Sequence, residues 1–198
     1  MARVRQFDTD EVLLQAMGVF REKGYENASI QDLVEATGLG RGSLYAAFES
    51  KANLYRLVLK RYVGQVGEVM RGQLVARMPV RESLRQLLIG RVDDVLEVPG
   101  RPGCLLVNAI VDHSARDDAT RRIAEDALAA VREMLAATLH TARGIGELPG
   151  DADVERLANF FVMVIQGLRV MGTIESDRNA LTAVVDTVLD VLPHQVEA

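Results

Sequence analysis

The chain has 198 residues and a mean hydropathy of +0.07. Apolar residues make up 48% of it, which is enough for a sizeable core. No stretch approaches the roughly 18 uninterrupted apolar residues of a membrane span, and the first residues lack the apolar segment of a secretory signal. The single cysteine, Cys104, excludes an internal disulfide and fits a reducing compartment, and the three histidines are far apart. We therefore expect a cytoplasmic protein without a membrane segment, a metal site or a cofactor.

The charge is unevenly distributed along the chain. The net charge of −5 excludes a protein that is basic overall. Residues 1–60 hold eight basic and eight acidic residues, whereas residues 61–198 hold fifteen and twenty. The acidity therefore belongs to the C-terminal part, and a locally basic face on the neutral N-terminal part remains open.

Four helices are predicted in the first third of the chain. Asp8 and Glu11 have the spacing of a capping box, and the helix that they begin should end at Gly24. A second, short helix should begin after Ser29 and stop at Thr37–Gly38. A third is expected over residues 41–47, and Ser50 should cap a long fourth helix.

The rest of the chain also follows the helical period. Beyond a break at Met78–Pro79, helices are expected near residues 81–97, 102–114, 117–143, 152–172 and 178–192. No sustained alternation of apolar and polar residues lies between turns, so strands are not expected. The prediction is an all-α fold of about nine helices. Residues 1–50 would form a small domain, residues 51–78 a connecting helix, and residues 79–198 a larger domain.

Residues 29–48 have the pattern of a helix-turn-helix. Gly38 can take the positive φ that a tight turn between two short helices needs. The second helix would then expose Arg41, Gly42, Ser43 and Tyr45, where a recognition helix meets the major groove. The glycine spacing alone also fits an ordinary hairpin of two helices. The residues that would pack the pair together are Ile30, Leu33, Val34, Ala36, Leu39, Leu44 and Phe48.

The full string of this segment resembles the signature of the TetR family of transcriptional regulators. The residues that carry the resemblance are Gly38, Leu39, Gly42, Leu44, Tyr45, Phe48, Ser50, Lys51 and Leu54, with Phe20, Gly24 and Tyr25 upstream. It covers about residues 6–66. The resemblance implies a homodimeric repressor that binds palindromic operator DNA and is released by a small molecule bound in the larger domain. One departure is Ala46–Ala47, where the family often has a histidine or tyrosine, so some hydrogen-bonding contacts to DNA are missing.

The resemblance also implies roles for individual residues. Ser29, Tyr45 and Lys51 match positions that contact the DNA backbone, and Gly42 and Ser43 share their surface. Arg41 is our candidate for base reading, because a guanidinium pairs bidentately with guanine. Simpler readings stay open: Arg41 as a solvated charge, Lys51 as an ordinary lysine near a helix cap, and Tyr45 packed on the fourth helix.

Two helices of the larger domain are candidates for dimerisation. Residues 152–172 are apolar nearly all the way round, and residues 178–192 carry one apolar stripe. TetR-like proteins pair these helices with those of a partner as a four-helix bundle. A buried central helix in a monomer is the alternative. The residues predicted for the seam are Phe161, Ile165, Leu168, Val184 and Val188.

A pocket for a small apolar or amphipathic ligand is harder to place. The candidates are Met134, Phe160, Met163, Gln166 and Arg169, although core filling and surface ion pairs are the simpler reading for each. Neither a nucleophile–base pair nor a carboxylate pair at catalytic spacing is present, so an enzyme is not expected.

Cys104 raises a second functional possibility. It stands at an expected helix start after Arg101, where the helix dipole and the positive charge would favour a thiolate. The apolar residues that follow predict burial instead, and burial is what we expect. A thiol-based redox or electrophile sensor of the same fold therefore stays as an alternative, as does an architectural DNA-binding protein that no ligand releases.

Overall fold

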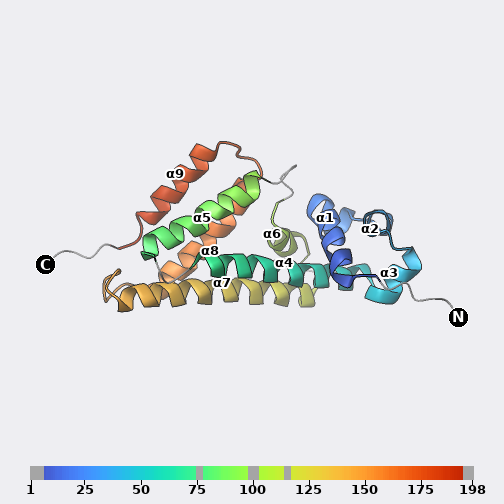
Figure 1. Cartoon of the computed structure of the whole chain (residues 1–198), viewed down its shortest axis with the longest axis horizontal. Helices are drawn as coiled ribbons and strands as arrows, with labels where there is room; N and C mark the ends of the chain where they lie inside the picture. The colour runs from blue at the N-terminus through green and yellow to red at the C-terminus, as the bar shows by residue number, and fades with distance from the viewer. Residues whose placement is uncertain (1–6, 75–77, 98–102, 114–116, 194–198) are drawn as a thin grey trace. The chain divides into compact units, whose positions relative to one another are not determined.

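The computed structural model describes residues 7–74, 78–97, 103–113 and 117–193, and helices account for all of their regular structure. These residues form nine α-helices and one π-helical segment, which confirms the all-α prediction (Figure 1). The elements are α1 (Thr9–Asn27), α2 (Ile30–Thr37), α3 (Arg41–Phe48), α4 (Lys51–Gln73), α5 (Val80–Leu96), α6 (Leu105–Asn108), η1 (Ala109–His113), α7 (Asp118–Gly144), α8 (Val154–Met171) and α9 (Arg178–Leu189).

The chain divides into two compact units. Unit 1 contains Met1–Gly64 and Cys104–Ala124, and unit 2 contains Gln65–Gly103 and Glu125–Ala198. Helices α4 and α7 each contribute residues to both units. The boundaries expected at residues 50 and 78 separate a DNA-binding part, a connecting helix and a larger domain, whereas these units are defined by the compactness of the fold. The functional boundaries stay a prediction.

The core of unit 1 forms where α1 packs on the first part of α4. The carboxylate of Asp8 accepts the N–H of Asp10 at 2.8 Å and so begins α1. Gly24 has φ 73° and ψ 170°, so the regular helix breaks where the sequence predicted its end. The ring of Phe20 lies edge-on to that of Tyr55, with 5.0 Å between the centroids. The buried side chains from α1 and α4 are Val12, Leu13, Ala16, Met17, Phe20, Leu54, Tyr55, Val58 and Leu59.

The segment after Gly103 differs from its prediction. In place of one helix over residues 102–114, the described residues form the four-residue α6 and the π turn of η1. Leu105 and Ala109 are completely buried, and both belong to the core of unit 1. A π turn holds about one residue more than an α turn, and the apolar pattern of so short a segment does not signal it.

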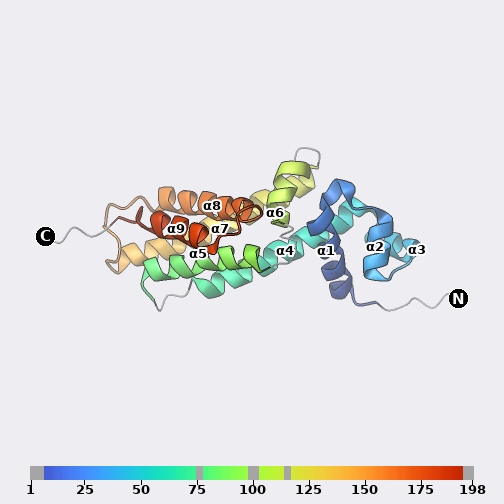
Figure 2. The same cartoon turned by 90° about the horizontal axis from the view of Figure 1, so that it is seen from above.

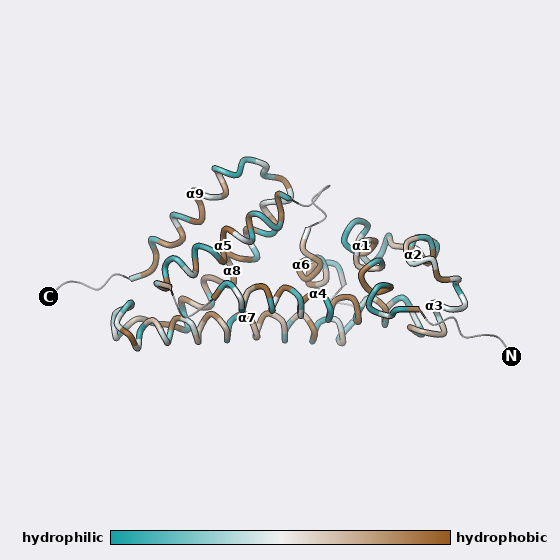
Figure 3. The backbone as a smooth tube through the Cα atoms, viewed as in Figure 1, coloured by the Kyte–Doolittle hydropathy of each residue, from teal (hydrophilic) through white to brown (hydrophobic). Residues whose placement is uncertain are grey.

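The core of unit 2 is built on α5, which packs against both α8 and α9. α5 and α8 run in the same direction (Figures 1 and 2). A Cβ atom on Gly172 would lie 2.7 Å from Cγ1 of Val95, so the end of α8 crosses α5 at close range. Figure 3 shows hydrophobic segments along α5, α8 and α9 that alternate with hydrophilic ones, as expected for helices that each bury part of their surface.

Candidate nucleic-acid interface and ligand-binding unit

The α2–α3 pair has the local geometry of a helix-turn-helix. At the start of α2, the backbone N–H of Asp32 donates to Oγ of Ser29 at 3.1 Å, and the N–H of Ser29 donates to Asp32 at 2.8 Å. Gly38 ends the helix with φ 64° and ψ 5°, and its N–H donates to the carbonyl of Val34 at 2.9 Å. The positive φ predicted for Gly38 is therefore confirmed, and α3 begins at Arg41, after Leu39 and the N-cap residue Gly40.

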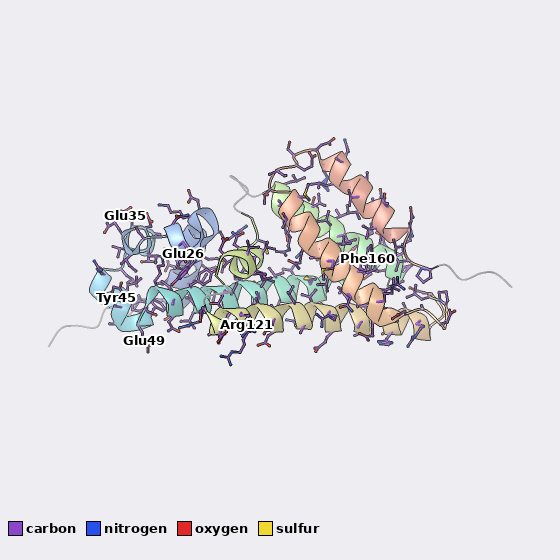
Figure 4. All side chains as sticks on the ribbon, turned by 180° about the vertical axis from the view of Figure 1, so that it is seen from behind. Glu26, Glu35, Tyr45, Glu49, Arg121 and Phe160 are labelled. Carbon is purple, nitrogen blue, oxygen red and sulfur yellow. The ribbon has the colours of Figure 1, made fainter. Side chains whose placement is uncertain are left out.

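Helix α3 has one buried and one exposed side. Leu44 and Phe48 are each 3% exposed and anchor the helix in the core of unit 1. Tyr45 is 38% exposed, and Figure 4 shows it at α3, at the end of unit 1 where Glu49 also lies. Cζ of Arg41 lies 5.8 Å from the centre of the Tyr45 ring, so the two side chains share one surface. The remaining exposed residues of the helix are Gly42, Ser43, Ala46 and Ala47.

Ser29 and Lys51 already have partners inside unit 1. Nζ of Lys51 donates to the carbonyl of Ala28 at 2.8 Å and lies 4.4 Å from the ring centre of Tyr25. Oγ of Ser29 donates to the carboxylate of Asp32 at 2.8 Å. These contacts hold the beginnings of α4 and α2 in place. Contact of Ser29 or Lys51 with a DNA phosphate stays a prediction, and each residue would have to make it while keeping its hydrogen bonds within unit 1.

The carboxyl of Asp32 is strongly stabilised in its ionised form. Nζ of Lys23 donates to it at 2.6 Å, and Ser29 supplies a backbone and a hydroxyl hydrogen bond. The lysine hydrogen bond comes first among the causes that lower the pKa of Asp32 from 3.8 to about 2.

A strained turn joins α3 to α4, and the sequence did not indicate it. Glu49 has φ 64° and ψ −49°, and the N–H of Ser50 donates to the carbonyl of Phe48 at 2.6 Å. This is the geometry of a classic γ-turn, which is uncommon and costly for a residue with a Cβ atom. Glu26, Glu35 and Glu49 are exposed acidic residues of the same unit (Figure 4).

The structure corrects two of the residues predicted for the dimer seam. Phe161 and Ile165 are 0% and 1% exposed, because α5 and its neighbours cover this side of α8 within a single chain. They are core residues, and their assignment to a seam is wrong. Val184 is 48% exposed and is available for a partner.

A shallow apolar groove runs between α8 and α9. It encloses about 340 Å³, with Leu168 and Val188 among its lining residues and Val184 beside them. Met163, Met171 and Ile174 add exposed apolar surface on or just beyond α8. Met163 is 73% exposed, so its predicted role as a ligand-binding residue stays a prediction. The other lining residues are Val164, Gly167, Met171, Glu175, Ala180 and Leu181.

The remaining ligand candidates lie in or against the core of unit 2. Arg169 is 6% exposed, and Met134 and Phe160 are half-buried against the apolar cluster. Oε1 of Gln166 is buried and has no hydrogen-bond partner. None of these four residues is among those that line a second hollow of about 200 Å³, which includes Leu74, Val80, Ser83, Thr138, Thr141 and Glu147.

Cys104 is buried in unit 1. Its side chain is 5% exposed, and the hydroxyl of Tyr62 donates to Sγ at 3.4 Å. The predicted burial is confirmed, whereas Arg101, whose charge would favour a thiolate, lies outside the described residues. Helix α6, which follows the cysteine, has only four residues.

The described ranges contain neither a candidate membrane helix nor a candidate metal site. None of their helices is both long and apolar enough to cross a bilayer. In the same ranges, no group of three His, Cys, Asp or Glu side chains could hold a metal ion.

Two family models match the chain. Residues 12–58 match "Bacterial regulatory proteins, tetR family", and residues 81–188 match "Tetracyclin repressor-like, C-terminal domain". Together they cover the α2–α3 pair and most of unit 2.

Whole-length relatives and solved structures agree with these matches. The chain is 30% identical to the HTH-type transcriptional repressor ComR of Escherichia coli over 98% of this chain and 93% of ComR. It is 29% identical to the uncharacterized HTH-type transcriptional regulator YezE of Bacillus subtilis over 97% and 100%. A cysteine mutant of the TetR family regulator CifR, solved with 26-bp operator DNA, is 35% identical, with a TM-score of 0.86 over 96% of this chain and 100% of that one. The regulatory protein TetR from Rhodobacter sphaeroides, 21% identical with a TM-score of 0.83 over 92% and 97%, shares the fold.

Proposed function

This chain belongs to the TetR family of bacterial transcriptional regulators, and we propose that it represses genes by binding palindromic operator DNA as a homodimer, from which a small molecule bound in unit 2 releases it. The observation that carries the proposal is the exposed side of α3. Arg41, Ser43 and Tyr45 face outward from a helix that Leu44 and Phe48 anchor in the core. The 35% identical CifR was solved on operator DNA, which supports the same use of this surface.

We assign different tasks to the residues of this surface. Arg41 would read a base, since its guanidinium can bind O6 and N7 of guanine together. Tyr45 and Ser43 would contact phosphates, and Ala46 and Ala47 would offer methyl groups to a thymine. Lys51 and the N-terminus of α2 behind Ser29 would sit against the backbone at the edge of the groove.

Replacement of Arg41 tests the base-reading assignment. An operator is first selected from a random DNA library with the wild-type protein. Arg41→Ala should then cost about 1–3 kcal/mol of binding free energy and relax base preference at one position in each half-site. Lys60→Ala removes the same charge from an exposed site about 13 Å further along α4 than Lys51, and it should change affinity little. If Arg41→Ala and Lys60→Ala lowered the affinity for every DNA sequence by the same factor, Arg41 would act only through its charge.

The groove between α8 and α9 supports the homodimer. Exposed apolar patches of this kind are uncommon on monomers, and a second copy of the same two helices would cover it. Gly167 in its lining has open space where a Cβ would stand, so two helices can approach closely there. A two-fold dimer would present two α3 helices to half-sites about 34–36 Å apart.

Ligand release is the regulatory part of the proposal. The ligand would be apolar or amphipathic, and it can shift DNA affinity only by binding the DNA-free state more tightly. The buried position of Cys104 favours an inert thiol over a sensor. No catalytic role is proposed, and the site of action would be the cytoplasm.

A further inference from the structure

The second hollow of unit 2 lies where the start of α5 meets the last turns of α7 (Figures 1 and 2). It encloses about 200 Å³. A cavity of about 150 Å³ can hold benzene, so a ligand of about seven or eight non-hydrogen atoms would fill this hollow. The apolar part of its wall includes Leu74, Met78, Val80 and Ile145.

The three hydroxyl groups in this wall can only accept hydrogen bonds from a ligand. Oγ of Ser83 donates to the carbonyl of Gln73 at 3.3 Å. Oγ1 of Thr138 and Oγ1 of Thr141 donate to carbonyls one turn earlier on α7, at 3.0 and 2.9 Å. A hydroxyl has a single hydrogen to donate, and in each of these three it is already used. Their lone pairs are what remains for a ligand.

Glu147 adds a negative charge to the same wall. Its Oε2 accepts the N–H of Val80, the first residue of α5, at 2.5 Å. The carboxylate therefore already occupies the position at the start of α5 where an anion would otherwise bind. Within the ranges that the structure describes, no lysine or arginine forms an ion pair with Glu147.

The two arginines that adjoin lining residues in the sequence are bonded to other groups. Nη2 of Arg81 lies 2.7 Å from the carboxylate of Asp190. Nη1 of Arg143 donates to the carbonyl of Ala152 at 3.1 Å. Residues 61–198 also hold twenty acidic and fifteen basic residues, so the field of the surrounding chain has the same sign as the charge in the wall. The hollow therefore combines acceptors, negative charge and apolar surface.

We propose that this hollow binds a small amphipathic cation, a primary ammonium group on a short apolar chain. The ammonium has three hydrogens and no acceptor, and it would donate to Glu147 and to the hydroxyl oxygens of the wall. Its chain would lie against the apolar residues. A carboxylate would meet other acceptors and a like charge, and an alcohol has one hydrogen to share among them. This inference rests on the proposed function, because it names the chemical class of the releasing ligand.

The test uses the full chain and three compounds that differ only in their polar group. Hexylammonium, 1-hexanol and hexanoate are titrated by isothermal titration calorimetry. We expect hexylammonium to bind at least about tenfold more tightly than 1-hexanol, because a hydrogen bond with an ionised partner is roughly twice as strong as a neutral one. Hexanoate should bind most weakly. No binding of hexylammonium, or binding no tighter than that of the alcohol, would overturn the proposal.

Three variants locate the bound cation. Glu147→Gln keeps an acceptor for the N–H of Val80 but removes the charge, so it should weaken hexylammonium binding at least about tenfold and leave 1-hexanol unchanged. Glu155→Gln removes the same charge from an exposed residue that pairs with His140 and does not line the hollow, and it should leave both unchanged. Ala137→Leu places a larger side chain in the wall and should weaken both. Hexylammonium binding that survives Glu147→Gln or Ala137→Leu would contradict the assigned site.

A parallel measurement separates this inference from the proposed function. Affinity for the selected operator is measured with and without each compound, for the wild type and for Glu147→Gln. Hexylammonium that binds the hollow but leaves operator affinity unchanged would support the cation site and contradict release through it. Release by 1-hexanol or hexanoate without binding of hexylammonium would support ligand release and overturn the cation site. Release by hexylammonium that persists in Glu147→Gln would also overturn it.

Discussion

Gly42 offers a substitution whose effects on stability and on DNA binding should have opposite signs. It is the second residue of α3, it is exposed, and a Cβ built on it meets no atom within 4 Å. Replacing glycine with alanine in a helix gains about 0.5–1 kcal/mol, because the unfolded chain loses conformational freedom. In a chain of this size, Gly42→Ala should therefore raise Tm by about 1–4 °C.

The same methyl group should weaken operator binding. In the proposed complex the first turn of α3 enters the major groove, where the absent Cβ allows the backbone to approach the DNA closely. Since nothing in unit 1 contacts the new methyl group, a loss of affinity can be assigned to the DNA side. Fluorescence anisotropy with the selected operator measures the affinity, and differential scanning calorimetry measures Tm.

Gly18→Ala is the matched control for this experiment. Gly18 is also exposed, lies inside α1 and has open space at its Cβ position. It should give the same rise in Tm with no change in operator affinity. If Gly42→Ala binds the operator as tightly as the wild type, the first turn of α3 does not approach DNA and the proposed docking is refuted. A fall in its Tm would refute the stability argument itself.

Three further predictions follow from the geometry. Glu49→Gly should stabilise the protein by about 1 kcal/mol, because glycine relieves the strained γ-turn, and unchanged urea unfolding would contradict this. The pKa of Asp32 falls from 3.8 to about 2 on folding. The contribution of its ionised carboxyl to stability is therefore complete above about pH 4 and is lost as the pH falls through 2. An NMR titration midpoint near 3.8 for Asp32 in the folded protein would refute the hydrogen bond from Lys23. Val184→Glu should convert the proposed dimer to a monomer in sedimentation velocity, whereas Gln86→Glu on the exposed side of α5 should leave it a dimer. A dimeric Val184→Glu would place the seam elsewhere.

The structure of the α2–α3 segment could be predicted from the sequence because its key interactions are local. Ser29 caps α2 through a residue three positions away, and Gly38 is placed where the turn requires a positive φ. Both interactions are made within one turn of helix, so residue type and spacing are enough to predict them. The exposed side of α3 follows from the same period, because burial of Leu44 and Phe48 leaves Arg41 and Tyr45 outward.

Contacts between residues that are far apart in the sequence could not be predicted from residue type and spacing. Lys51 has the position of a phosphate-binding lysine, yet its ammonium group is bound to the carbonyl of Ala28, 23 residues earlier. Arg91 is one of many arginines in the sequence, and only the fold buries it beside Gln73. These partners come from other helices, and no spacing along the chain specifies them.

Helix α8 shows most clearly what only the tertiary structure decides. Because it is apolar on nearly every side, its periodicity cannot say which face the chain itself will cover. The packing of α5 buried Phe161 and Ile165 and left Met163 and the groove beside Val184 exposed. The sequence determined that α8 must be covered on more than one side, and the position of α5 determined which side stays exposed.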